Sequence, residues 1–258
     1  MVRVSIGLVV GALLFGALDV QGAQAEASLQ SRISSDRPGR IESGTYLAGD
    51  HIGFALAAAG ADYLLSFDGS PEIFVLHANN ASLGGRVLKY DSGETALLVS
   101  GWGGITLYTD ADPAGLPAVR TGECAIPAPV AAVSVADVEN AALDDAEHLA
   151  WGRRLDLAFS ADWNALADSA PARAMALDAM ENVTRGIERF GKSAPGHAAL
   201  ARNVKTVVLA TAGQPTVTLK GSTLLVTFDP DRGLEGRASS RTISRALRAL
   251  LRATHGPG

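Results

Sequence analysis

The sequence predicts an α+β protein in which an N-terminal antiparallel β-meander, forming a small barrel or a sandwich, is followed by an α+β module with a C-terminal amphipathic helix. Between residues 45 and 109, short apolar runs are separated by turns of Gly, Asp and Ser every eight to twelve residues, which is typical of antiparallel strands. Beyond residue 133 the apolar residues recur at helical spacing. The stretch between these patterns contains Pro113, Pro117, Pro127 and Pro129.

Composition places the chain among globular proteins. Of its 258 residues, 47% are hydrophobic and 19% are charged, and the formal net charge is −5. A disordered chain is less apolar than this, and a protein whose whole surface grips nucleic acid carries a positive charge. The length allows one large domain or two small ones.

The meander is predicted from seven short apolar runs. They begin at Thr45 and end at Tyr108, and the clearest alternation of inward and outward side chains runs from Arg86 to Tyr90. The expected strands cover residues 45–47, 52–56, 63–67, 73–77, 86–90, 96–99 and 105–108.

The proline-rich stretch is interpreted as a connector rather than a strand, because proline cannot donate a hydrogen bond to a β-ladder. We therefore expect a signal peptide at 1–25, a β-module at 26–109, a connector at 110–133 and an α+β module at 134–258.

The second module is predicted to contain three helices and four strands. Ser134, with Asp137 three residues later, is expected to cap a first helix that ends near Trp151. Ser169 and Pro171 are expected to begin a second helix that ends at Gly191. The other expected elements are strands at 154–160, 205–210, 216–219 and 224–228, the last two joined as a hairpin, and a helix at 240–252.

The first 25 residues have the layout of a cleavable secretory signal. Arg3 precedes an uncharged run at residues 4–18, and Ala23-Gln24-Ala25 supplies a small-residue cleavage site. Fifteen apolar residues are fewer than the roughly 20 that a membrane-spanning helix needs. We therefore expect an exported chain, periplasmic or secreted, with no transmembrane span after cleavage.

No known catalytic motif is present, so the catalytic residues are unknown at this point. If a hydrolytic carboxylate pair were assembled from separate segments, Asp68, Glu72 and Asp162 would be its candidates. The five histidines are scattered, and we expect neither a metal site nor a cofactor. Cys124 is the single cysteine, and it is either a buried small hydrophobe, which is favoured, or half of an intermolecular disulfide.

Charge is concentrated at the C-terminal helix. Residues 203–258 hold eight basic and three acidic side chains, and four arginines fall within about 60° of one another on the expected helix, opposite its leucines. These arginines are Arg241, Arg245, Arg248 and Arg252. The stripe is expected to be open, with its leucine face buried.

Three interpretations of this arginine stripe remain open: a solvated face, ion pairs with the acidic first helix, or contact with anionic envelope material such as lipid head groups. In the first helix the acidic residues are Asp137, Glu139, Asp144, Asp145 and Glu147. Trp102, in Gly101-Trp102-Gly103-Gly104, either faces a ligand or folds back over the core. The candidate interaction surface consists of the four arginines and Trp102.

Several segments resemble a family of uncharacterised exported proteins of alphaproteobacteria, of about this length. The segments are 40–44, 67–76, 103–109 and 233–240. The resemblance covers nearly all of the mature chain and rests on turn and strand residues. The family is a domain of unknown function, so it implies no catalytic residues.

These observations favour a non-enzymatic periplasmic or envelope protein that binds a small molecule, a glycan or a protein partner, because catalytic motifs are absent and a meander with a helical cap is a usable binding scaffold. The alternative is an envelope hydrolase with a carboxylate pair. The expected partner is an envelope component or a small ligand, and nucleic acid is not expected.

Overall fold

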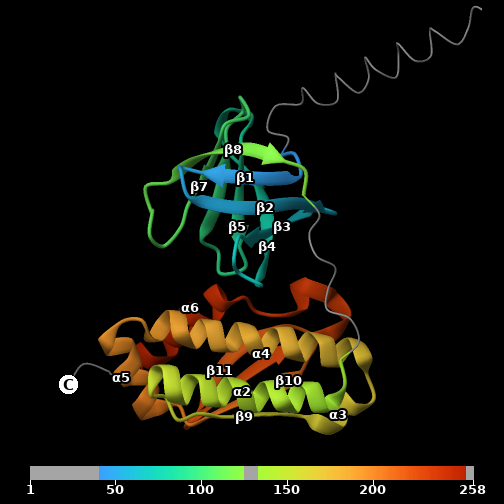
Figure 1. Ribbon diagram of the computed structural model, residues 1–258, viewed down its shortest axis with the longest axis vertical. Helices are drawn as coiled ribbons and strands as arrows, with labels where there is room; N and C mark the ends of the chain where they lie inside the picture. Colours follow the sequence, from blue (N-terminus) through green and yellow to red (C-terminus); the bar gives the residue numbers. More distant parts are fainter. Residues whose placement is uncertain (1–40, 125–132, 254–258) are drawn as a thin grey trace, which may run out of the picture.

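The computed structural model describes residues 41–124 and 133–253 (Figure 1). The expected signal peptide, together with Pro127 and Pro129 of the expected connector, lies outside these residues. A β-barrel is stacked on a module of helices and a small sheet, and the two share the long axis of the molecule (Figure 1). The predicted α+β class and the order of its two halves are confirmed.

Within residues 41–124, eight antiparallel strands form a closed barrel in which each strand pairs with the next and β8 pairs with β1. The strands are β1 Gly44–Ala48, β2 Ile52–Ala59, β3 Asp62–Phe67, β4 Ile73–Asn80, β5 Arg86–Tyr90, β6 Thr95–Val99, β7 Ile105–Leu107 and β8 Leu116–Gly122. A barrel of eight strands is narrow enough for its own side chains to fill.

The interior of the barrel is crossed by a row of aromatic rings, one from each of the first five strands. Neighbouring ring centres are 5.2 to 6.4 Å apart. The row consists of Tyr46, Phe54, Phe67, Phe74 and Tyr90. It ends at Tyr90, whose ring lies against Arg241 of the second module.

The expectation that residues 110–133 contain no strand is wrong, because β8 lies inside this stretch. Pro117 is the second residue of β8 and pairs with Thr106. Its carbonyl oxygen still accepts a hydrogen bond from the Gly49 N–H, at 3.0 Å. Proline is tolerated near the start of a strand, where one missing donor does not break the ladder.

The second module places a four-stranded sheet against a layer of helices. In the strand order β11-β12-β10-β9, β10 runs parallel to both neighbours and β11 is antiparallel to β12. Its strands are β9 Ala158–Ala161, β10 Thr206–Thr211, β11 Thr216–Lys220 and β12 Thr223–Phe228. Its helices are α2 Val135–Arg153, α3 Trp163–Ala167, α4 Ala170–Gly191, α5 Ala194–Asn203 and α6 Ser240–Ala253.

The helix starts follow the predicted caps. Ser134 and Asp137 form a reciprocal capping box at α2, and the Ser169 hydroxyl accepts from the Ala172 N–H at the start of α4. The short helices α3 and α5 were not predicted. The strand expected at 154–160 begins only at Ala158, because Arg154 ends α2 with a left-handed backbone, φ 55°.

Each half has its own cluster of buried apolar side chains. Helix α4 contacts α2, α5 and α6, and it also contacts β10 and β12. The contacts between the two halves are mainly polar and gather around the start of α6, which is therefore the element that positions the barrel.

Candidate functional site

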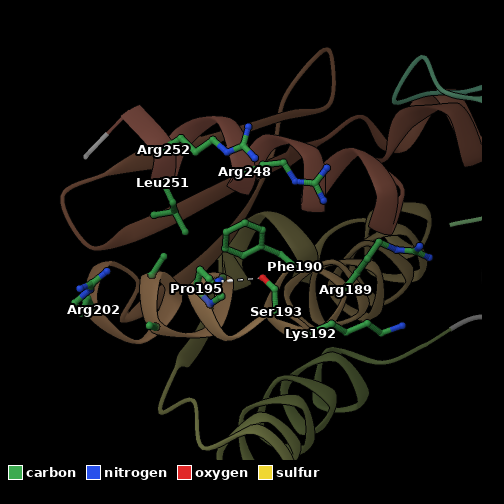
Figure 2. Close-up of a pocket in the computed structure, with 12 residues that line it drawn as sticks. Arg189, Phe190, Lys192, Ser193, Pro195, Arg202, Arg248, Leu251 and Arg252 are labelled. Carbon is green, nitrogen blue, oxygen red and sulfur yellow. Dashed lines mark hydrogen bonds between the residues drawn. The ribbon is translucent and has the colours of Figure 1, made fainter. Parts of the chain in front are cut away.

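A groove of about 680 Å³ lies where α4, α5 and α6 meet (Figure 2). Phe190 from the end of α4 and Leu251 from α6 point toward one another across it, while Arg248 and Arg252 extend along α6 (Figure 2). Its lining residues are Arg189, Phe190, Lys192, Ser193, Pro195, Gly196, Ala198, Ala199, Arg202, Arg248, Leu251 and Arg252.

The groove exists because α4 stops and α5 begins within two residues. The Ser193 hydroxyl accepts a hydrogen bond from the Gly196 N–H at 3.2 Å, and Pro195 occupies the first turn, so α5 starts at Ala194. A Cβ atom at Gly196 would collide with the carbonyl oxygen of Phe190. Glycine therefore allows α5 to fold tightly against the end of α4.

The charge of this groove is one-sided. Five basic side chains line it, and none of its lining residues is acidic. Within the described part of the chain, Lys192, Arg248 and Arg252 form no ion pair. Phe190, Pro195, Ala199 and Leu251 supply apolar surface beside these cations. The arrangement suits a ligand with both an anionic group and an apolar part.

A second hollow of about 490 Å³ adjoins the groove at the junction with the barrel. It is lined by Gly93, Glu94, Arg245, Arg248, Ala249 and Arg252. Arg248 and Arg252 line both hollows.

The barrel covers the first arginine of the predicted stripe and leaves the others exposed. The expectation that the whole stripe is open is therefore wrong for Arg241. Only 9% of the Arg241 side chain is exposed. Its guanidinium lies 2.8 Å from a Glu94 oxygen, 2.9 Å from an Asp110 oxygen and 4.2 Å from the centre of the Tyr90 ring. Arg245 donates to the Ser92 carbonyl but stays exposed. The two later arginines, Arg248 and Arg252, are exposed as expected.

The contacts with Arg241 and Arg189 keep the Asp110 carboxyl ionised at the junction between barrel and helices. Burial by itself raises the pKa of the Asp110 carboxyl, but Arg241 and Arg189 outweigh it and the pKa lies below its ordinary value. Burial raises the pKa of Tyr90 to about 12. Asp110 also pairs with Arg189, so one carboxylate links the groove to the barrel.

The leucine face of α6 is buried, with one exception. Ile243, Leu247 and Leu251 are at most 2% exposed, whereas Leu250 is only half-buried. Of the three interpretations of the stripe, ion pairs with the acidic first helix are not found among the described residues: the acidic partners of Arg241 come from the barrel.

Glu72, a candidate catalytic carboxylate, caps α6 instead. Its two oxygens accept hydrogen bonds from the Ser240 N–H at 2.8 Å and the Ser240 hydroxyl at 2.7 Å. Asp91 accepts from the N–H and hydroxyl of Ser239 in the same way. Burial raises the pKa of Glu72, although the bonds from Ser240 and the charges of Arg185 and Arg237 oppose the shift. Carboxylates at a helix N-terminus accept hydrogen bonds from its unpaired N–H groups and interact favourably with the positive end of the helix dipole.

The other two candidate carboxylates lie apart in the fold. Asp162 accepts from the Ala165 N–H at 3.2 Å and caps α3, while Asp68 is exposed in the turn after β3. Cys124 is free and half-buried, with its sulfur 3.5 Å from the Leu56 carbonyl oxygen. In the ranges 41–124 and 133–253, no three His, Cys, Asp or Glu side chains are grouped so as to hold a metal ion.

Trp102 does not join the arginines. It is 94% exposed in the β6–β7 turn, so it does not fold back over the core. Sequence reasoning also missed Arg189, Lys192 and Arg202, because the segment that carries them is acidic overall. The pattern that could have revealed them is the placement of basic residues near the ends of two consecutive helices, α4 and α5.

The described helices include none that is both long and apolar enough to cross a bilayer. The fold and groove thus define an α+β protein in which a filled barrel is joined to a helical module with a basic, partly apolar groove. The chain belongs to the family described as Domain of unknown function (DUF4908), whose model matches residues 25–247. No curated protein and no solved structure matches it. A family of unknown function, as the resemblance implied, is therefore confirmed.

Proposed function

We propose that this protein is an exported, non-enzymatic binding protein of the bacterial envelope whose ligand is an amphiphilic organic anion held in the α4–α5–α6 groove. The observation that carries the proposal is the meeting of five basic side chains, no acidic ones and an apolar wall in one concave site. A volume of about 680 Å³ lies within the usual range of small-molecule sites.

This groove differs from a solvated stripe on one helix because its basic side chains converge from several helices. Its cations come from three helices: Arg189 from α4, Arg202 from α5, and Arg248 with Arg252 from α6. In a chain with a net charge of −5, such a concentration repels other cations and raises the local concentration of anions. Arginine also offers paired N–H donors that match carboxylate and phosphate oxygens.

Binding explains the candidate carboxylates better than hydrolysis does. Glu72 and Asp162 each cap a helix, so each has a structural role that requires no reaction. Export rests on the uncharged run at 4–18 and on the small-residue site that ends at Ala25. N-terminal sequencing of the exported protein is expected to begin at Glu26, and an intact Met1 would contradict export with cleavage.

Calorimetric titration with decyl phosphate tests the groove, with inorganic phosphate and decanol as probes of the charged and apolar halves. Decyl phosphate is expected to bind more tightly than either, because it alone satisfies both. Arg248→Glu with Arg252→Glu is expected to weaken its binding by at least about tenfold, since the repulsion of two reversed charges replaces their attraction.

The matched control is Arg86→Glu with Lys220→Glu, which changes the net charge by the same amount at exposed positions away from the groove. Its affinity for decyl phosphate is expected to stay within about twofold of the natural chain. Equal losses in both variants, or an absence of binding to the natural chain at millimolar decyl phosphate, would refute the proposal.

A further inference from the structure

The end of the barrel farthest from α6 carries three turns without a charged residue. Because strands alternate in direction, the β2–β3, β4–β5 and β6–β7 turns lie at this end, and the turns that contact α6 lie at the other. The three turns cover residues 60–61, 81–85 and 100–104, and none of these residues is charged.

Two large apolar side chains stand out from this surface. Leu83 is 90% exposed and Trp102 is 94% exposed, the two highest values among the exposed large apolar residues of the described chain. Their turns touch, because Gly101 packs against the Leu83 carbonyl so closely that a Cβ atom would not fit. Leu83 and Trp102 therefore belong to one patch, which we call the barrel tip.

The backbone holds Leu83 outward at a cost. Its φ of 56° and ψ of 35° place it in the left-handed region, which disfavours a leucine by about 1–2 kcal/mol. Glycine would avoid this cost, and a leucine that served the fold would lie against the core. Strain at an exposed apolar side chain indicates a role outside the folded core.

The N-terminal segment enters the barrel at the same end. The Ser43 hydroxyl accepts from the Ala58 N–H at 3.0 Å, beside the β2–β3 turn, and β1 begins at Gly44. Residues 1–40, which include the uncharged apolar run at 4–18, therefore join the described chain near the barrel tip.

The tip is too small for a stable protein interface. Two large side chains bury on the order of 400 Å², whereas a stable partner needs about 800 Å² from each side. Tryptophan favours the interface between water and lipid, where its ring is buried and its N–H stays hydrated. We propose that the barrel tip is an interfacial anchor: Leu83 and Trp102 insert into the head-group region of a lipid bilayer and orient the protein on the membrane surface.

The charges around the tip make this contact hydrophobic rather than electrostatic. Arg86 is exposed where β5 leaves the tip, while Arg120 near the end of β8 pairs with Glu42 and Glu123, so these four side chains carry no net charge. Binding is therefore expected on zwitterionic membranes, with little dependence on salt. Contact through the arginine groove would instead require anionic lipid and would weaken as salt rises.

Sedimentation with phosphatidylcholine vesicles, at 0.15 and 0.5 M salt, tests the anchor. The full chain without its signal peptide is expected to bind, and Leu83→Asn with Trp102→Ser is expected to bind at least about tenfold less. Asparagine accepts the left-handed backbone of Leu83, so the variant keeps its fold. The matched control is Leu143→Asn with Trp151→Ser, another exposed leucine–tryptophan pair, on α2; its binding is expected to be unchanged.

Brominated phosphatidylcholine gives a second readout in a background with Trp151→Phe and Trp163→Phe, which leaves Trp102 as the single tryptophan. Trp102 fluorescence is expected to be quenched by bromine near the head groups. Failure of the natural chain to bind, or an equal loss in the α2 control, would refute the anchor. Binding only to anionic vesicles, lost in Arg248→Glu with Arg252→Glu, would also refute it and would assign membrane contact to the groove.

Discussion

Arginines of similar appearance in the sequence have different roles in the structure. Arg237 has a side chain that is only 1% exposed, and it pairs with Asp178 and donates to the Ile73 carbonyl at 2.7 Å. Arg241 is likewise enclosed by barrel carboxylates, whereas Arg248 and Arg252 remain exposed. A buried guanidinium needs partners to replace its lost hydration. On α6 itself, the barrel carboxylates Glu94 and Asp110 pair with Arg241, near the start of the helix.

Asp145 is the clearest source of pH-dependent stability. Burial between helices raises its pKa to about 6; the nearby Thr184 hydroxyl opposes this shift, Glu181 adds to it, and Arg185 and His148 oppose it. One of its carboxylate oxygens is buried without a hydrogen-bond partner. Between about pH 4 and pH 6 the folded state therefore holds a proton that the unfolded state has lost, so stability falls as the pH rises.

We expect Asp145→Asn to raise the free energy of unfolding by about 1–2 kcal/mol at pH 7.5 and to change it little below pH 4, where the natural carboxyl is neutral in both states. Urea unfolding across this pH range measures the difference. Asp144→Asn, at an exposed neighbouring position, serves as the control and is expected to show no such dependence. A variant that is less stable at pH 7.5 would show that the charged carboxylate contributes favourably.

At the scale of elements, the close packing of α4 against α6 depends on one glycine. A Cβ atom at Gly186 would lie 2.6 Å from Cγ2 of Ile243 and 3.1 Å from the Ser240 carbonyl oxygen. The second neighbour belongs to backbone and cannot rotate away. Gly186 therefore fixes how near the arginine-bearing helix approaches the rest of the module, and with it the shape of the groove.

Gly186→Ala is expected to destabilise the protein by about 1–3 kcal/mol, because α6 must shift to admit the methyl group. Gly152→Ala, in α2, is the matched control: its nearest neighbour would be a His148 carbon at 4.0 Å, so it is expected to stabilise by about 0.5 kcal/mol through helix propensity. Urea unfolding of both variants measures the contrast. Stabilisation by both would mean that α4 and α6 separate freely.

At the scale of the whole molecule, two apolar cores meet through a polar junction. The barrel core and the helical core are separate clusters of buried side chains. Between them, Glu72 and Asp91 cap α6, and Arg241 binds Glu94 and Asp110. Such a junction fixes orientation through directional contacts while each core keeps its own apolar burial.

The barrel is expected to fold by itself only when β8 is included. A fragment of residues 26–124 should be monomeric and unfold cooperatively, because all eight strands are paired. A fragment of residues 26–109 leaves the edges of β1 and β7 open and should aggregate or remain unfolded. Size-exclusion chromatography and thermal melts monitored by circular dichroism compare the two. A stable, monomeric 26–109 fragment would show that closure by β8 is dispensable.

Local signals predicted elements wherever they were strong. Each cap, at Ser134 and at Ser169, and each step of the apolar stripe of α4 joins residues only three or four apart along the chain, so these patterns are visible in the sequence. The signal for β8 was weak, because Leu116 and Ala118 are the only side chains of that strand that pack against the barrel core, and Pro117 argues against a strand. Helix α3 spans five residues, too few for a period to be recognised.

The candidate site likewise has one part that local sequence patterns predict and one part that they do not. The arginine stripe of α6 could be predicted, since helical periodicity alone places Arg241, Arg245, Arg248 and Arg252 on one side. The groove could not, because Arg189 and Arg202 reach it from other helices. The role of Glu72 was also hidden: its partner Ser240 is 168 residues away along the chain.

By itself the sequence determined the α+β class, the order of barrel and helical module, the helix caps and the basic character of the C-terminal helix, because these follow from periodicity and from contacts between near neighbours. Tertiary structure decided which arginines are buried, which carboxylates cap α6, and that Leu83 and Trp102 share one end of the barrel. Those outcomes depend on residues that are distant in sequence, and only closure of the barrel and its docking on α6 bring them together.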